Sequence, residues 1–373
     1  MGYKTTTVEE HVFGAPDHGL PVVIDDFSLA MHLGISCKTL WYLVRGVRTP
    51  AGEIESLYQE GSILKRGSAG KKGKRRIIHI PDPRLKRVQR ILDNKFVQPI
   101  PVGNHVRAYE KGRVPADTAR MCANSGILLS MDLKNFFGNT RLSWIRDLFM
   151  SKGYSRSIAS IMAQLCCCTT AEDGHKRRRF MPQGTPVSPS ISNRVADLRF
   201  DRKILELSKN EGWTYLRYSD NIYMSHPDVL PRDVVDKFKT SVIKSVNEAG
   251  WKVHKVRATP KWKRQEVLGL VVNEKANPKT EEYRSLRAII NNCKRMGFAS
   301  QVSKARDLLN PKIQSEENLI AHLRGKLSYV GQVLCESKRE KLLGDFEDAL
   351  EAEKLRIKQQ WAEEDAIDQR KGV

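Results

Sequence analysis

The stretch Tyr215–Ser225 constrains the fold of this chain more than any other part of the sequence. Aromatic, apolar and β-branched residues flank a short polar centre, Ser219-Asp220-Asn221. This pattern predicts two strands joined by a tight turn, because Asp and Asn tolerate the positive φ that a two-residue hairpin needs. An ordinary surface hairpin would carry the same pattern. In either case the turn would hold the carboxylate of Asp220 on a rigid support at the end of a sheet.

A second apolar segment, Leu128–Phe137, brings another carboxylate, Asp132, to the end of a predicted strand. Two strands that each deliver one Asp to the same end of a sheet can hold a pair of divalent cations. Such a pair suits in-line phosphoryl transfer, because the attacking and the leaving oxygen both need a metal. This second Asp makes the reading of Tyr215–Ser225 as an ordinary hairpin less attractive.

Length and charge bound the class of protein. A chain of 373 residues can bury a sizeable core, and we expect two or three subdomains. The formal net charge of +21 predicts a polyanionic partner, most simply nucleic acid, although an anionic membrane surface would also attract such a chain. No apolar run approaches the length of a membrane span, and the N-terminus lacks the apolar region of a signal peptide. We therefore expect no membrane association and a cytoplasmic location.

The cysteine pattern argues against a structural metal. The chain has seven cysteines, and none belongs to a Cys-x-x-Cys pair. Cys166, Cys167 and Cys168 are adjacent, so they cannot form a conventional zinc site among themselves. We expect reduced thiols in the core.

The N-terminal part is predicted to be helical from Asp25 onward. Phe27, Leu29, Ala30 and Leu33 would share one face, Gly34 would end the first helix, and Ser36 would cap a second. Two interpretations stay open: a helix-turn-helix that reads DNA, or a helical extension packed on the rest of the protein, which we favour.

Further elements follow from composition and periodicity. Ser62–Lys65 and Arg75–Ile80 predict a hairpin with a cationic loop, and His175–Arg179 predicts a second basic loop. Thr280 is expected to cap a basic helix, and the tail from Glu336 is expected to form an exposed helix or a partner contact. Helices are also predicted at Pro83–Ile91, Thr140–Met150, Ser155–Cys167, Ile191–Glu211 and Pro231–Ala249.

Three motifs in order resemble a known family. Asp132-x-x-x-Phe136-Phe137 and Tyr218-Ser219-Asp220-Asn221 are similar to the first and third palm motifs of reverse transcriptases. Between them, Pro182-Gln183-Gly184-x-x-x-Ser188-Pro189 resembles the motif under the nascent base pair in the bacterial, retron-type branch. Arg76-x-Ile-x-x-Pro81 is similar to its fingers strand. The Leu33-Gly34-Ile35 turn is also similar to that of its helical N-terminus.

The resemblance implies an α+β, right-hand polymerase fold of fingers, palm and thumb with a helical N-terminal extension. The extension would cover residues 1–50, the fingers and palm 51–276, and the helical thumb and tail 277–373. It also implies two Mg²⁺ ions on Asp132 and Asp220, with Asn221 as the third catalytic residue.

The resemblance further assigns residues to substrates. The incoming dNTP would meet Arg76, a guanidinium that grips phosphate in one orientation, and Phe137, a ring that leaves no room for a 2′-hydroxyl. Gln183 and Gly184 would border the nascent pair. Contacts to nucleic acid would come from Tyr218, Arg257, Leu268, Gly269, Arg284 and Arg287.

The sequence departs from the family in three places. Asn221 stands where the third motif usually has a second Asp, which removes one negative charge from the predicted metal site. Thr118-Ala119-Arg120-Met121-Cys122 replaces the Asn-Ala-x-x-His of retrons, and Val267-Leu268-Gly269 replaces Val-Thr-Gly. The last two changes favour a relative of the retron enzymes over a standard member, although a true retron enzyme that makes RNA-linked DNA stays open.

The expected function is RNA-directed DNA synthesis on a cognate non-coding RNA, in an anti-phage defence system. Predicted partners are the RNA, an RNA/DNA duplex, dNTPs and a separate effector protein, since no second domain is visible. Two rivals stay open. One is a catalytically dead polymerase fold that serves as an RNA-binding scaffold, and Asn221 in place of the usual Asp keeps this alternative open. The other is untemplated or protein-primed synthesis.

Overall fold

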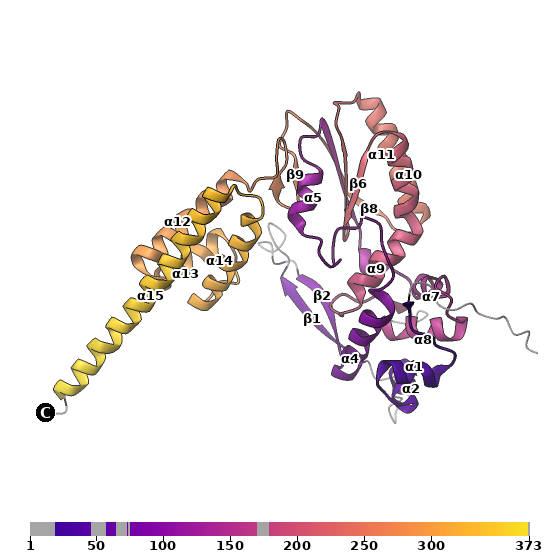
Figure 1. Ribbon diagram of the computed structural model, residues 1–373, viewed down its shortest axis with the longest axis horizontal. Helices are drawn as coiled ribbons and strands as arrows, with labels where there is room; N and C mark the ends of the chain where they lie inside the picture. The colour runs from indigo at the N-terminus through magenta and orange to yellow at the C-terminus, as the bar shows by residue number, and fades with distance from the viewer. Residues whose placement is uncertain (1–18, 46–56, 65–72, 74, 170–178, 372–373) are drawn as a thin grey trace, which may run out of the picture. The chain divides into compact units, whose positions relative to one another are not determined.

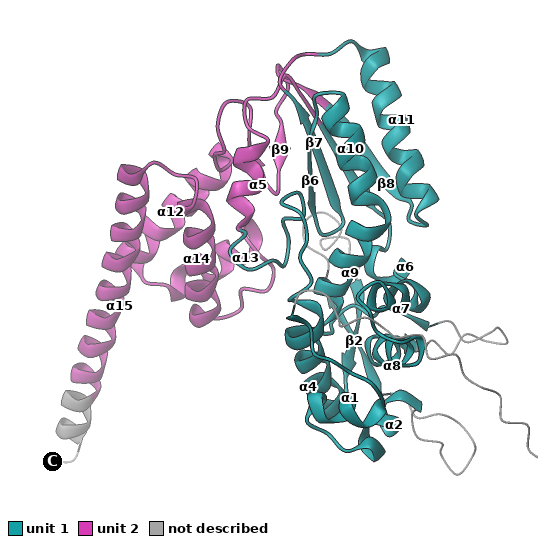
Figure 2. Ribbon diagram, turned by 45° about the vertical axis from the view of Figure 1, so that its right-hand side comes forward, with its two compact units in different colours: residues 1–113, 129–226, 230–258 teal, residues 114–128, 227–229, 259–373 magenta. Residues whose placement is uncertain are grey.

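The computed structural model describes residues 19–45, 57–64, 73, 75–169 and 179–371, with the side chains of 365–371 left out (Figure 1). The chain divides into two compact units (Figure 2). The first holds residues 1–113, 129–226 and 230–258, and the second holds 114–128, 227–229 and 259–373. The cationic loops predicted after Lys65 and before Arg179 lie almost entirely outside the described residues. No helix among the described residues is long and apolar enough to span a membrane.

A four-stranded sheet organises the first unit, in the order β6-β7-β3-β8. Its strands are β3 (Ile127–Leu133), β6 (Thr214–Tyr218), β7 (Asn221–His226) and β8 (Val253–Pro260). The predicted hairpin at Tyr215–Ser225 is confirmed, since β6 and β7 pair antiparallel from Thr214 with Ser225 to Tyr218 with Asn221. The turn between Tyr218 and Asn221 therefore lies at one end of the sheet, where the edge strand β6 leads into the central strand β7.

A broken helix follows the Pro-Gln-Gly motif. One continuous helix was predicted over Ile191–Glu211, whereas the structure has α9 (Ser188–Ala196), a π-helical segment η3 (Asp197–Asp201) and α10 (Arg202–Asn210). All of α9 except Pro189 is buried. By contrast, α10 is amphipathic and packs on β6. The π-segment lies between these two environments, and such segments are frequent at functional sites.

Aromatic packing holds the region after β3 in place. Helices α6 (Phe136–Asn139) and α7 (Leu142–Met150) follow the strand, and α11 (Arg232–Glu248) leads into Trp251. Trp251 is fully buried, and its ring centroid lies 4.6 Å from that of Trp144 and 5.2 Å from that of Phe200. Its indole N–H donates to the carbonyl of Phe136 at 3.0 Å. Replacing a buried ring of this size costs about 3–5 kcal/mol, so Trp251 is a main anchor of this part of the fold.

The N-terminal helices are packed on the first unit. Helices α1 (Asp26–Leu33) and α2 (Cys37–Arg45) contact α4 (Pro83–Leu92) and α8 (Arg156–Cys166). Gly34 ends α1 in the left-handed conformation, and the hydroxyl of Ser36 accepts from Thr39 N–H, as predicted. The prediction that Phe27 shares a face with Leu29, Ala30 and Leu33 was wrong, because Phe27 is exposed whereas the other three are buried. The packing agrees with a helical extension.

Two small hairpins complete the first unit. Strands β1 (Tyr58–Leu64) and β2 (Arg75–Pro81) pair antiparallel, as the sequence predicted. Strands β4 (Cys168–Thr169) and β5 (Arg179–Phe180) form the other pair. A π-helical turn, η2 (Asp93–Val97), extends α4.

The second unit is mainly helical. Its strands β9 (Glu266–Val267) and β10 (Leu270–Val271) form a short hairpin. A continuous apolar core joins α12, α13, α14 and α15, and includes Leu286, Leu323 and Phe346. The helices are α5 (Pro115–Met121), α12 (Thr280–Met296), η4 (Ala299–Gln301), α13 (Val302–Leu308), α14 (Glu316–Gly331) and α15 (Glu336–Lys371).

Two predictions for the second unit were wrong in detail. Thr280 is the first helical residue of α12 rather than its cap, since Lys279 occupies the N-cap and makes no side-chain capping bond. The tail from Glu336 is not exposed throughout, because Leu342, Phe346 and Ala349 of α15 are buried in the core of the unit. The prediction was based on the alternating charges of the tail and overlooked these apolar positions.

Candidate active site

The turn between β6 and β7 presents Asp220. Tyr218 and Asn221 form the last pair, so Ser219 and Asp220 are the two turn residues. The positive φ falls on Ser219, at 59°, and not on Asp or Asn as the sequence suggested. A positive φ at the first turn residue alone is the pattern of a type II′ turn, where glycine is usual. A non-glycine residue persists there only when its surroundings hold the turn firmly.

The structure brings Asp132 and Asp220 together, as predicted. The N–H of Leu133, directly after Asp132, donates to the carbonyl of Asp220 at 2.8 Å. Burial raises the pKa of Asp220, the charge of Asp132 raises it further, and Arg76 opposes the shift. A desolvated carboxylate beside a second carboxylate is stabilised by a bound cation. The all-oxygen donor set therefore fits Mg²⁺, which prefers carboxylate ligands and water.

Asn221 lies against Asp220. Its side-chain N–H donates to a carboxylate oxygen of Asp220 at 3.0 Å. A second Asp in this position would repel Asp220 instead of bonding to it in the absence of a cation. Asn221 thus orients Asp220 and leaves its own amide oxygen as a neutral donor for a metal.

Strand β2 is fixed against the Pro-Gln-Gly motif. The N–H of His79 donates to the carbonyl of Gln183 at 2.7 Å, and the His79 ring meets Phe180 edge-on, with centroids 5.4 Å apart. Gly184 has φ of 106°, and a Cβ there would lie 3.1 Å from the His79 carbonyl oxygen. Glycine is therefore needed for this close approach. The contact fixes strand β2, which also carries Arg76, against the Pro-Gln-Gly motif.

Phe137 and Arg257 lie in the same unit as Asp132 and Asp220. The Phe137 ring lies edge-on to Phe136, with centroids 5.4 Å apart, and is partly buried. Arg257 is exposed on β8, which is an edge strand of the sheet. Within the described part of the chain, no hydrogen bond or ion pair links either side chain to Asp132 or Asp220.

Four predicted nucleic-acid contacts lie in the second unit. Leu268 and Gly269 form the turn between β9 and β10 with φ values of 52° and 88°. The Tyr329 hydroxyl donates to the Leu268 carbonyl at 2.5 Å. Arg284 and Arg287 are exposed on α12, in keeping with a basic helix face.

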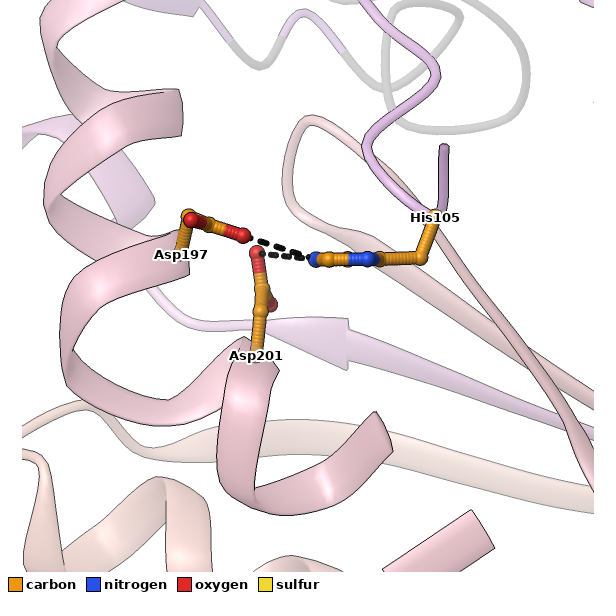
Figure 3. Close-up of side chains that lie close together, drawn as sticks. All are labelled: His105, Asp197 and Asp201. Carbon is orange, nitrogen blue, oxygen red and sulfur yellow. Dashed lines mark hydrogen bonds and ion pairs between the residues drawn. The ribbon is translucent and has the colours of Figure 1, made fainter. Parts of the chain in front are cut away.

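Sequence reasoning missed a buried polar network behind the Asp220 turn. Its centre is Arg217, whose side chain is fully buried and is paired with Asp201 at 2.7 Å. His105 and Asp197 join the same group (Figure 3). The signal was present, because a charged residue inside an apolar strand predicts a buried counter-ion.

Comparison with known proteins gives the same family as the motifs. Residues 63–270 match the model of the family "Reverse transcriptase (RNA-dependent DNA polymerase)". The chain is 28% identical over 324 residues to the retron Mx65 reverse transcriptase of Myxococcus xanthus, covering 84% of this chain and 69% of that protein. It is 25% identical over 327 residues to the retron Ec86 reverse transcriptase of Escherichia coli, covering 86% and 88%. The family match spans Asp132, Asp220 and the Pro-Gln-Gly motif, so this chain belongs to the reverse transcriptase (RNA-dependent DNA polymerase) family and has retron enzymes among its relatives.

Proposed function

We propose that this reverse transcriptase adds dNTPs to a primer 3′-hydroxyl with two Mg²⁺ ions and copies a cognate non-coding RNA. The main support is the bond from Leu133 N–H to the Asp220 carbonyl, which joins the two carboxylate-bearing strands at one sheet end. Asp132 and Asp220 would hold the ions, with Asn221 beside them. Bound Mg²⁺ activates the attacking hydroxyl and neutralises charge on the triphosphate.

Residues of the first unit are proposed to bind the incoming dNTP. Arg76 would grip the triphosphate, and this role is supported by the charge of Arg76, which lowers the pKa of Asp220. Gln183 and Gly184 would border the nascent base pair, and Phe137 would exclude a 2′-hydroxyl. Because β2 is bonded to Gln183, these groups would move together.

Contacts to the primer, the duplex and the leaving pyrophosphate are proposed for individual residues of each unit. Tyr218 would lie beneath the primer end, Arg257 would meet the leaving pyrophosphate, and Leu268 and Gly269 would grip the primer strand. Arg284 and Arg287 would follow the duplex backbone. In this scheme residues 51–276 are the fingers and palm, and residues 277–373 are the thumb and tail.

We further propose that the protein acts in the cytoplasm, in a defence system that combines a non-coding RNA with a separate effector protein. It is supported by the retron relatives and by the net charge of +21. The RNA-binding scaffold is the second candidate, since Asn221 removes a carboxylate from the third motif.

The test is to purify the protein from its own host and sequence the nucleic acid that comes with it. In parallel, dNTP incorporation with Mg²⁺ is compared for wild type, Asp220→Ala and the control Asp233→Asn, an exposed carboxylate on α11. The proposal predicts a bound RNA and matching DNA made by wild type and the control but not by Asp220→Ala.

The other outcomes contradict the proposal in distinct ways. DNA with no matching RNA would indicate untemplated synthesis. Bound RNA without incorporation, under any primer or metal, would leave the scaffold function.

A further inference from the structure

One group of side chains in the described part of the chain has the spacing of a metal site. Ligand atoms of His105, Asp197 and Asp201 all lie within 4.8 Å of one another, and all three residues are buried (Figure 3). His105 Nε2 lies 2.8 Å from Asp197 Oδ1 and 3.7 Å from Asp201 Oδ2. Spacing alone would permit a divalent cation here.

The carboxylate of Asp201 is already saturated by protein donors. Arg217 Nε donates to its two oxygens at 3.0 and 2.9 Å, and Arg217 Nη2 donates at 2.7 Å. The Tyr215 hydroxyl donates to the same carboxylate at 2.6 Å. A dication beside this buried guanidinium would be repelled by it, so the group is an ion-pair network and not a metal centre.

The guanidinium of Arg217 also holds two backbone carbonyls. Its Nη2 donates to the carbonyl of Asn193 at 3.1 Å, and its Nη1 to the Asn193 side-chain oxygen at 2.9 Å and to the carbonyl of Ser219 at 3.2 Å. Its backbone is fixed as well, by bonds of 2.7 Å to His105 and Arg107. All three guanidinium nitrogens are therefore engaged.

The carbonyls of Ser219 and Asp220 are thus held one after the other. Arg217 binds the Ser219 carbonyl, and Leu133 N–H binds that of Asp220. Ser219 has a positive φ that a non-glycine residue adopts only under constraint. We propose that Arg217, clamped by Asp201 and Asn193, is a positioning residue that fixes the Ser219-Asp220 turn and thereby the direction of the Asp220 carboxylate. This inference rests on the proposed role of Asp220 in metal binding.

The test uses a charge-balanced pair of substitutions. Asp201→Asn with Arg217→Met removes the ion pair and the bond to the Ser219 carbonyl but buries no unpaired charge. We expect kcat to fall at least about tenfold, since a misplacement of about 1 Å can cost about 100-fold. The Mg²⁺ concentration for half-maximal rate should rise, and Mn²⁺ binding, followed by electron paramagnetic resonance, should weaken. The affinity for RNA should stay unchanged.

A buried, hydrogen-bonded side chain away from the turn is the control in the same unit. The side-chain amide of Gln89 donates to the Leu165 carbonyl at 2.9 Å and to the Tyr58 hydroxyl at 3.0 Å, and among the described residues it has no bond to Asp201, Asn193, Arg217 or Ser219. Gln89→Met should lower the thermal unfolding midpoint yet leave kcat and Mn²⁺ binding near wild type. Arg217→Lys keeps the charge but loses the planar fork, and should show an intermediate kcat.

Three results would overturn the inference: unchanged kcat and Mn²⁺ affinity in the charge-balanced variant, equal losses in the control, or wild-type kcat in Arg217→Lys. If the charge-balanced variant does not fold, Arg217→Lys decides. A stoichiometric metal retained by Asp132→Asn/Asp220→Asn would restore the metal interpretation of His105, Asp197 and Asp201. If wild type itself incorporates no dNTP, the proposed function fails, while Mn²⁺ binding still tests the positioning role.

Discussion

At the scale of single residues, Asn221 is expected to tune the proposed metal site. It donates a hydrogen bond to Asp220, whose pKa is already raised by burial and by Asp132. In Asn221→Asp a third carboxylate would repel the other two and would strengthen their attraction for a dication. We predict that the Mg²⁺ concentration for half-maximal incorporation falls severalfold, measured by titrating Mg²⁺ in a primer-extension assay.

The control for this prediction is Asn221→Ala, which removes the hydrogen bond without adding charge. It should require more Mg²⁺ than wild type. A higher requirement in Asn221→Asp than in wild type would contradict the account of Asn221 as a weakened ligand.

Phe137 gives a second prediction at this scale. If its ring excludes the 2′-hydroxyl, Phe137→Ala should raise NTP use relative to dNTP use by about tenfold or more, as expected when a steric block is removed. The measurement is the ratio of kcat/KM for ATP and dATP. Phe137→Tyr keeps the ring and should keep the discrimination, and equal ratios in all three proteins would show that Phe137 is only a core aromatic.

At the scale of elements, the β9–β10 hairpin carries strain at Leu268. Both turn residues have positive φ, which suits Gly269 but not Leu268. Leu268→Gly should therefore raise the free energy of unfolding by about 1 kcal/mol, measured by urea denaturation. If Leu268 contacts the primer, the same variant should bind a primer–template less tightly.

Gly269→Ala is the matched control, because it adds strain at the neighbouring residue and should destabilise the protein. Tyr329→Phe removes the bond to the Leu268 carbonyl and separates loss of the tether from loss of the side chain. Lower stability in Leu268→Gly would contradict the assignment of strain.

Most elements were predictable because their signals are local. Periodicity and turn residues located α4, α7, α8 and α11 to within a few residues. The π-segment Asp197–Asp201 lies between the buried α9 and the amphipathic α10. It was not predictable, because the apolar periodicity of residues 191–211 indicates one continuous helix.

At the scale of the whole molecule, the net charge of +21 predicts salt-sensitive RNA binding. Each phosphate contact contributes about −0.7 to −0.9 to the slope of log K against log salt. Replacing both Arg284 and Arg287 by Ala should reduce the steepness of that slope by about 1.4–1.8, measured by filter binding from low to moderate salt.

Lys294 on the same helix is the control for this prediction. It is paired with Asp348 at 2.7 Å, so its charge is largely compensated within the protein. Lys294→Ala should change the slope by less than half as much as the double arginine replacement. A change of half as much or more would show that the slope reports the net charge of the protein and not contacts of Arg284 and Arg287.

The sequence by itself determined the family, the two carboxylates and the hairpin that carries one of them. Those features follow from short motifs and a period-two pattern, which need no knowledge of long-range contacts. Only the tertiary structure decided that Leu133 bonds to Asp220, that His79 bonds to Gln183, and that Arg217 holds Ser219. These bonds join residues distant in the chain or depend on the exact turn geometry, so packing alone fixes them.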